Sequence, residues 1–204
     1  MEDINALESI QHLVRYAHFA YRNRDGTEFR GLATDLKGHF RHRNLQIRTP
    51  FLTKLSPLIT SNTHVHLGIR NNDTLVLAFR GTDFPLTLED WIDLERWCGF
   101  VGNLCTYISY SFTPISWDGD DLAGSLAHEG FLEAFNNQHQ KLRDNIHELV
   151  EGEPRKVEVC GHGLGGALAT LCALWCRGRW PKADITCVTL GSPRVLKSNT
   201  KAHI

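Results

Sequence analysis

The sequence predicts an α/β protein, because strand-like and helix-like segments alternate along most of its 204 residues. Thr74–Phe79 and residues 185–190 are short apolar runs bounded by turn residues, as expected for buried strands. The stretch after His128 places apolar residues at helical spacing. We therefore expect a mainly parallel sheet with flanking helices. At this length the chain is expected to form one domain, residues 1–204.

The composition is that of an ordinary globular protein, with 42% hydrophobic and 22% charged residues. The formal net charge of −1 gives no argument for a nucleic-acid partner. The acidic, polar N-terminus lacks the basic and apolar segments of a secretory signal. The six cysteines show no paired spacing for zinc. We expect reduced thiols in a cytoplasmic protein without a metal or cofactor, with disulfides as the alternative.

The N-terminal half contains one clear helix and one less regular region. Residues 4–21 are predicted to form a helix that packs across the sheet. The basic residues in 38–43 are interpreted as a solvated loop rather than a phosphate site, because no aromatic residues are interleaved with them. His64 and His66 alternate within a strand that pairs with Thr74–Phe79, and we expect their side chains on its exposed side.

Residues 98–117 contain no charged side chain, so a membrane span has to be considered. Two glycines, a proline and several hydroxyl residues dilute the hydropathy of this stretch. A packed or lid-like structure is therefore favoured, with transient lipid contact as the second alternative and a span as the third.

The candidate catalytic motif lies between residues 157 and 169, where a strand, a glycine-rich turn and a helix are expected to follow one another. This order is the scaffold of a nucleophile elbow, whose motif is Gly-x-Ser-x-Gly. Gly161, His162, Leu164 and Gly165 fit the motif, but Gly163 stands where the serine should be. The alternative is an ordinary strand-to-helix turn that binds an anion at the helix N-terminus.

Glycine at position 163 has a physical meaning if the turn is an elbow. The central residue of such a turn has a strained backbone, which costs a residue with a side chain on the order of 1–3 kcal/mol. Glycine adopts the same conformation with little steric cost. The replacement therefore keeps the turn and removes the attacking oxygen.

Four segments together carry a family resemblance, and they occur in this order: Leu-Ala-Phe-Arg-Gly-Thr at 77–82, Asp-Trp at 90–91, His-Glu-Gly-Phe at 128–131, and the elbow continuing into Gly-Ser-Pro-Arg-Val at 191–195. With these segments the chain resembles the class 3 (fungal-type) lipases of the α/β-hydrolase fold. The resemblance implies that lipid esters such as acylglycerols are hydrolysed by a Ser-Asp-His triad.

The resemblance also assigns roles to individual residues. Thr82 and Leu164 would supply the N–H donors of the oxyanion hole. The segment from 84 to about 94 would form a lid that opens at an oil–water surface, which implies transient contact with a membrane or lipid droplet. Packing in the core is the alternative role for its tryptophan. The apolar lid residues would be Phe84, Trp91, Ile92 and Leu94.

The sequence departs from the family pattern in its catalytic residues. Gly163 replaces the nucleophile, and the catalytic aspartate and histidine should follow it in that order. Asp184 and His203 occur in the permitted order, but Asp184 precedes a strand and His203 is next to the terminus. We therefore expect a C-terminally truncated, incomplete domain without its final strands.

Three functional hypotheses remain open from the sequence. The first is a lipase-family domain of lipid metabolism that is catalytically silent as written. The second is a pseudoenzyme that binds acyl chains, a lipid surface or a partner protein. The third is a knockout or fragment of an active intracellular lipase. All three imply a lipid or ester ligand.

Overall fold

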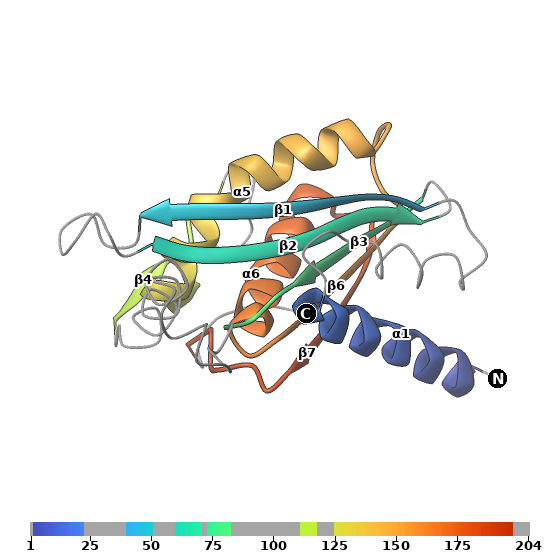
Figure 1. The fold of residues 1–204 in the computed structure, drawn as a ribbon, viewed down its shortest axis with the longest axis horizontal. Coiled ribbons are helices and arrows are strands. Elements are labelled where there is room, and N and C mark those ends of the chain that lie inside the picture. The colour runs from blue at the N-terminus through green and yellow to red at the C-terminus, as the bar shows by residue number, and fades with distance from the viewer. Residues whose placement is uncertain are drawn as a thin grey trace.

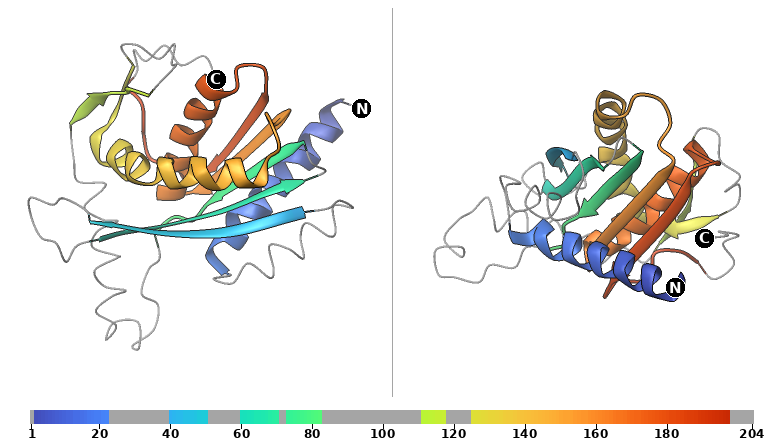
Figure 2. Two further views of the ribbon diagram at one scale, coloured as in Figure 1. Left: turned by 90° about the horizontal axis from the view of Figure 1, so that it is seen from above. Right: turned by 90° about the vertical axis from the view of Figure 1, so that its right-hand side faces the viewer.

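The structure is a computed structural model that describes residues 2–22, 40–50, 60–70, 73–82, 111–117 and 125–197. A five-stranded sheet lies at its centre, with helices α5 (Glu129–Leu149) and α6 (Leu164–Arg179) on one face. Helix α1 (Glu2–Arg22) crosses the opposite face (Figures 1 and 2). The predicted α/β arrangement with flanking helices is confirmed, whereas the single-domain assignment stays a prediction.

The sheet has an antiparallel part and a parallel part. Its strand order is β1-β2-β3-β6-β7. The first three strands pair antiparallel, and β3, β6 and β7 run parallel. A separate pair of short strands, β4 and β5, is antiparallel. The bounds are β1 Phe40–Pro50, β2 Thr60–Arg70, β3 Thr74–Phe79, β4 Phe112–Pro114, β5 Leu126–His128, β6 Lys156–His162 and β7 Asp184–Leu190.

The central strand β3 is buried on both faces, which explains its continuous apolar sequence. Alternation along the strand directs Leu75, Leu77 and Phe79 into the core beneath α5 and α6. Val76 and Ala78 point the other way and pack against α1. Each fully buried side chain of leucine size contributes about 1.5–3 kcal/mol to folding. The two helix layers are therefore held to the same strand.

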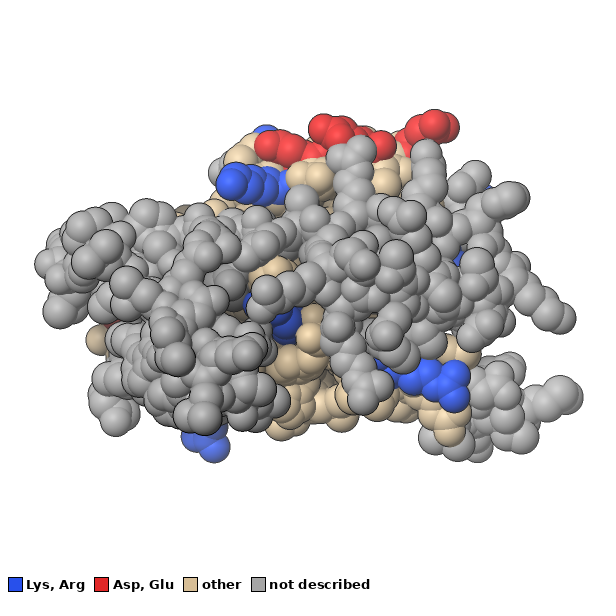
Figure 3. Space-filling view, viewed as in Figure 1, with Lys and Arg blue, Asp and Glu red and all other residues tan. Residues whose placement is uncertain are grey.

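Helix α5 is amphipathic in the way that its sequence predicts. The apolar residues that recur at helical spacing along it are buried, namely Phe131, Phe135, Leu142, Ile146 and Leu149. Acidic side chains, with Asp144 and Glu148 among the exposed residues, gather on the outer side of this helix (Figure 3). Charged side chains of the helix thus face solvent, and its apolar side chains face the sheet.

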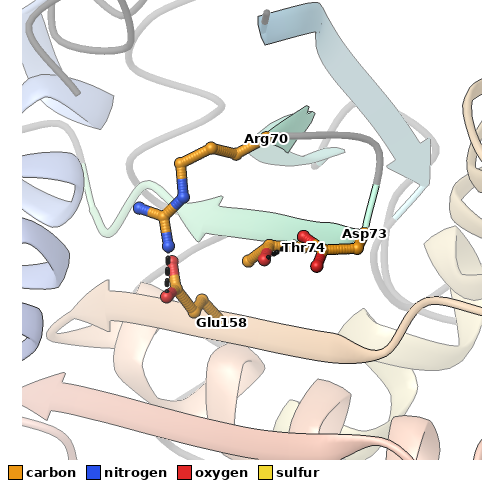
Figure 4. A network of polar contacts seen from close by, with 4 residues as sticks. All are labelled: Arg70, Asp73, Thr74 and Glu158. Carbon is orange, nitrogen blue, oxygen red and sulfur yellow. Dashed lines mark hydrogen bonds and ion pairs between the residues drawn. The ribbon is translucent and has the colours of Figure 1, made fainter. Parts of the chain in front are cut away.

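A polar contact lies on the face that α1 covers. Arg70 extends from β2 across the sheet to Glu158 on β6, with 2.6 Å between the guanidinium and carboxylate (Figure 4). Both side chains are mostly buried. Burial raises the pKa of the neighbouring Tyr16 on α1 to about 12, while the Arg70 charge opposes this rise. Removing one partner of the ion pair would leave the other charge poorly solvated, which is strongly destabilising.

Two predictions about the N-terminal half are wrong. Residues 40–43 lie in β1 rather than in a solvated loop, because pairing with β2 imposes a strand on a segment with no strand-like pattern of its own. His64 and His66 are buried rather than exposed, with 4% and 1% of their surface accessible. His66 lies opposite Ala78 in the register, which places it on the face that α1 covers.

The predictions about cysteines and membrane spans are tested only in part. Cys160, Cys172, Cys176 and Cys187 are free thiols, as expected, and the first three are buried. Cys98 and Cys105 lie outside the described residues. Among the described helices, none is both long and apolar enough to cross a membrane. Of the uncharged stretch 98–117, only residues 111–117 are described.

The buried His66 predicts a loss of stability in acid. Burial, reinforced by the Arg80 guanidinium, lowers the pKa of His66 from 6.5 to about 4. The folded state therefore binds this proton less readily than the unfolded chain, and the stabilisation present above pH 6.5 is lost as the pH falls towards 4. The loss is on the order of 3 kcal/mol.

Chemical denaturation at a series of pH values between 7 and 4 would measure this loss. In His66→Gln the decline in unfolding free energy should become shallower, because that residue no longer titrates. His147→Gln, at an exposed position on α5, should keep the wild-type slope. Equal slopes in all three proteins would contradict the assignment.

Candidate nucleophile elbow

The predicted strand, turn and helix are confirmed, and a single residue makes the turn. Strand β6 ends at His162, α6 begins at Leu164, and Gly163 between them has φ 57° and ψ −123°. Its N–H donates to the Leu190 carbonyl at 2.9 Å, and its own carbonyl accepts from Gly166 N–H at 2.9 Å. Residue 163 is thus held at the carboxyl ends of β6 and β7 in a conformation that favours glycine.

The turn is tight because strand and helix backbones touch. A Cβ atom on Gly161 would overlap the Gly165 carbonyl, and one on Gly165 would overlap the Phe79 carbonyl. Gly166 packs against Ser192, so that its added Cβ would lie 2.9 Å from the serine Cβ. The glycines of the motif therefore allow the start of α6 to sit between the ends of β3 and β7.

The start of α6 offers backbone donors. Its N-cap is Gly163, and no side chain caps the helix. The first amides, of Leu164 and Gly165, have no carbonyl one turn earlier to bond within the helix. The helix dipole adds partial positive charge at this end. Such a terminus can stabilise a carboxylate or the oxyanion of an acyl-transfer intermediate.

Thr82 directly follows Gly81, which packs against the last residue of β6. A Cβ atom on Gly81 would overlap the His162 carbonyl and the Tyr21 hydroxyl. The Thr82 hydroxyl oxygen is buried and has no hydrogen-bond partner. A buried hydroxyl without a partner costs about 1–3 kcal/mol. A ligand oxygen at the turn would remove that cost, although the roles of Thr82 and Leu164 as oxyanion donors stay predictions.

Tyr21 has a role at the elbow that no sequence motif indicates. Its hydroxyl lies 2.8 Å from Nδ1 of His162, and the two rings meet edge to face with centroids 5.7 Å apart. The last turn of α1 therefore joins the elbow, although the two residues are 141 positions apart. The helical spacing of apolar residues predicts that Tyr21 lies on the side of α1 that faces the sheet, but it does not predict the contact with His162.

The structure separates Asp184 from the elbow. Asp184 pairs with Lys156 at the first residues of their strands, whereas His162 pairs with Leu190 at the last residues. Six residues of parallel strand place the two ends roughly 20 Å apart. Asp184 therefore cannot orient a base at residue 163. His203 and the predicted lid residues Phe84, Trp91, Ile92 and Leu94 lie outside the described residues.

The described ranges contain no candidate metal site. No group of three or more histidine, cysteine, aspartate or glutamate residues there could hold a metal ion.

The fold and the strand–turn–helix site together define an α/β-hydrolase domain. The family model described as Lipase (class 3) matches residues 76–204, which is more than half of the chain. The chain therefore belongs to the class 3 lipase family, whose activity is the hydrolysis of lipid esters.

Two curated relatives illustrate this membership. Phospholipase A(1) DAD1, chloroplastic, of Arabidopsis thaliana is 29% identical over 129 residues, covering 59% of this chain and 27% of that protein. A lipase of Rhizomucor miehei is 31% identical over 127 residues, covering 60% of this chain and 29% of the fungal protein. The matched stretch thus spans less than a third of either relative.

Solved structures support the fold. Lipase II from Rhizopus niveus superposes with a TM-score of 0.61 at 20% identity, covering 95% of this chain and 65% of that one. The triacylglyceride lipase of Rhizomucor miehei gives a TM-score of 0.54 at 21% identity, covering 94% and 64%. At these identities the likeness establishes the α/β-hydrolase fold alone.

The backbone of residue 163 predicts the effect of restoring a side chain. Gly163→Ser should lower the free energy of unfolding by about 1–3 kcal/mol, because a residue with Cβ is strained at positive φ. Gly163→Ala should lose a similar amount, since it carries the strain without the hydroxyl. Urea denaturation of both variants would measure the effect.

Gly178→Ala provides a control within the same helix. Gly178 lies inside α6, where alanine is favoured over glycine by about 1 kcal/mol. The control should therefore be neutral or stabilising. Unchanged stability of Gly163→Ser and Gly163→Ala would show that the turn is not strained.

Proposed function

We propose that this chain binds acyl lipids or lipid esters at the elbow and lacks the serine-dependent hydrolysis of its family. The observation that carries the proposal is Gly163 with φ 57° at the turn between β6 and α6. In an acyl-transfer site, the residue at this position must present an oxygen or sulfur nucleophile. Glycine keeps the backbone of the turn and presents none.

The proposed binding site uses the groups that remain. A carboxylate or ester carbonyl would accept hydrogen bonds from the amide at the start of α6 and from the buried Thr82 hydroxyl. Hydrogen bonds to a charged oxygen are worth about 1.5–3 kcal/mol each. The absence of a serine side chain leaves more room for the ligand oxygen beside Leu164.

The surroundings of His162 also fit a site without a serine triad. In a triad, the imidazole is oriented by a carboxylate and takes the proton of the serine hydroxyl. Here a phenol, that of Tyr21, contacts Nδ1. The histidine belongs to β6 itself and directly precedes residue 163, so it is not placed as the base of a serine in the next position.

We further place the protein in the cytoplasm, in transient contact with membranes or lipid droplets. Free thiols at all four described cysteines are consistent with a reducing compartment. A lipid ligand with low solubility in water would be acquired most readily at such a surface. A partner protein that occupies the same site is the alternative, and ligand competition would distinguish the two.

Binding and turnover can be tested separately on the purified protein. Oleate binding, measured by isothermal titration calorimetry, should be saturable, and triolein should release no fatty acid. Thr82→Val should weaken oleate binding by roughly tenfold, because one hydrogen bond to the carboxylate is lost. Thr186→Val, at an exposed position on β7, should bind like the wild type.

Each half of the proposal can fail on its own. Triolein hydrolysis that copurifies with the protein and is blocked by a serine-directed phosphonate would overturn the claim of silence. The absence of heat from oleate, with Thr82→Val indistinguishable from the wild type, would overturn the claim of binding.

A further inference from the structure

The segment of residues 80–82 leaves strand β3 beside the elbow. Strands β3 and β6 run parallel, and the last residues that pair between them are Phe79 and Gly161. The chain that follows Phe79 therefore runs alongside the last residue of β6, just before the turn at Gly163. Thr82 is the last described residue of this segment.

Backbone contacts hold the first part of the segment. The N–H of Arg80 donates to the His64 carbonyl of β2 at 2.9 Å. Gly165, the second residue of α6, packs against the other side of the chain. A Cβ atom on Gly165 would overlap the Phe79 carbonyl and would lie 2.9 Å from the Arg80 carbonyl oxygen. The backbone of Arg80 thus lies between β2 and the start of α6.

A side chain from α1 reaches the next residue of the segment. The Tyr21 hydroxyl and the His162 carbonyl both lie so close to Gly81 that a Cβ atom there would overlap them. The same hydroxyl lies 2.8 Å from Nδ1 of His162. Tyr21 therefore touches the end of β6 and the segment after β3 at one point, and glycine leaves room for this close approach.

We propose that Tyr21 is a positioning residue for the binding site at the elbow and that it acts through Gly81 on Thr82. The peptide group between Gly81 and Thr82 is planar, so the position of Gly81 determines where the Thr82 N–H and side chain begin. With the phenol hydroxyl against it, Gly81 has no room to move towards α1. Hydrogen bonds from Thr82 weaken steeply outside a narrow range of distance and angle, so a small displacement of Gly81 matters. The inference rests on the proposed function, in which Thr82 donates to the ligand oxygen.

Tyr21→Phe isolates the contact, because it removes the hydroxyl and keeps the ring. The edge-to-face contact between the rings of residues 21 and 162, with centroids 5.7 Å apart, does not need the hydroxyl. The apolar packing of α1 on the sheet also remains. Arg15→Gln, at an exposed position on the same helix, is the matched control.

Oleate binding, measured by isothermal titration calorimetry, gives the first test. Tyr21→Phe should weaken binding roughly fivefold, and Arg15→Gln should bind like the wild type. In a protein that already carries Thr82→Val, Tyr21→Phe should change the affinity less than twofold, because the group that it positions is gone. A purely structural role would produce the same loss in both backgrounds, and that result would overturn the inference.

A second test needs no ligand. Backbone order parameters of Gly81 and Thr82, from ¹⁵N relaxation, should be near the rigid value of about 0.85 in the wild type and should fall in Tyr21→Phe. They should stay unchanged in Arg15→Gln. Unchanged values in a folded Tyr21→Phe would overturn the inference whether or not oleate binds.

A measurement on the wild type covers the case in which the variant fails to fold. Nuclear Overhauser effects should connect the ring protons of Tyr21 with the α-protons of Gly81, and their absence would overturn the inference.

These tests separate the inference from the proposed function. If oleate does not bind the wild type but Thr82 loses order in Tyr21→Phe, the proposed function fails and positioning by Tyr21 stands. If oleate binds the wild type and Tyr21→Phe equally well, only the inference fails.

Discussion

The arrangement of the site depends on one constraint, the reversal of the chain within a single residue between β6 and α6. The reversal requires positive φ at Gly163 and contact between the backbones of Gly161 and Gly165. It also fixes where the first helical amides point, since the helix axis starts at that residue. The neighbours His162 and Leu164 are placed by the same turn, one on the α1 side of the sheet and one in the core. The same turn thus sets the positions of both the helical amides and the imidazole.

Glycine at position 163 favours the stability of the turn, but it offers no side chain for catalysis. A serine would present its hydroxyl from a strained backbone, and active sites commonly carry such strain. Glycine relieves this strain and has no side chain that could attack a substrate. Only the packing around the turn then maintains its geometry. Gly163 has angles that would strain any other residue, and the ends of β3, β7 and α6 pack closely around it.

The sequence predicts what is encoded locally. The strands β3, β6 and β7 and the helices α1, α5 and α6 follow from apolar periodicity and glycine placement, and the structure confirms them. It does not predict β1, because residues 40–50 become a strand only by pairing with β2. The burial of His66 depends on α1 crossing that face, which no local pattern encodes. The contact of Tyr21 with His162 joins residues 141 apart and could be found only from the fold.

Helix α1 links the core of the protein to the elbow. Its apolar residues pack against Val76, Ala78 and Cys160, and its Tyr16 lies beside the pair formed by Arg70 and Glu158. These contacts fix the axis of the helix, and the Tyr21 hydroxyl in its last turn therefore lies next to His162. The orientation of the imidazole is therefore a consequence of how α1 packs on its face of the sheet. The orientation of His162 adds no separate energetic cost, because the interactions that hold the ring also hold the fold.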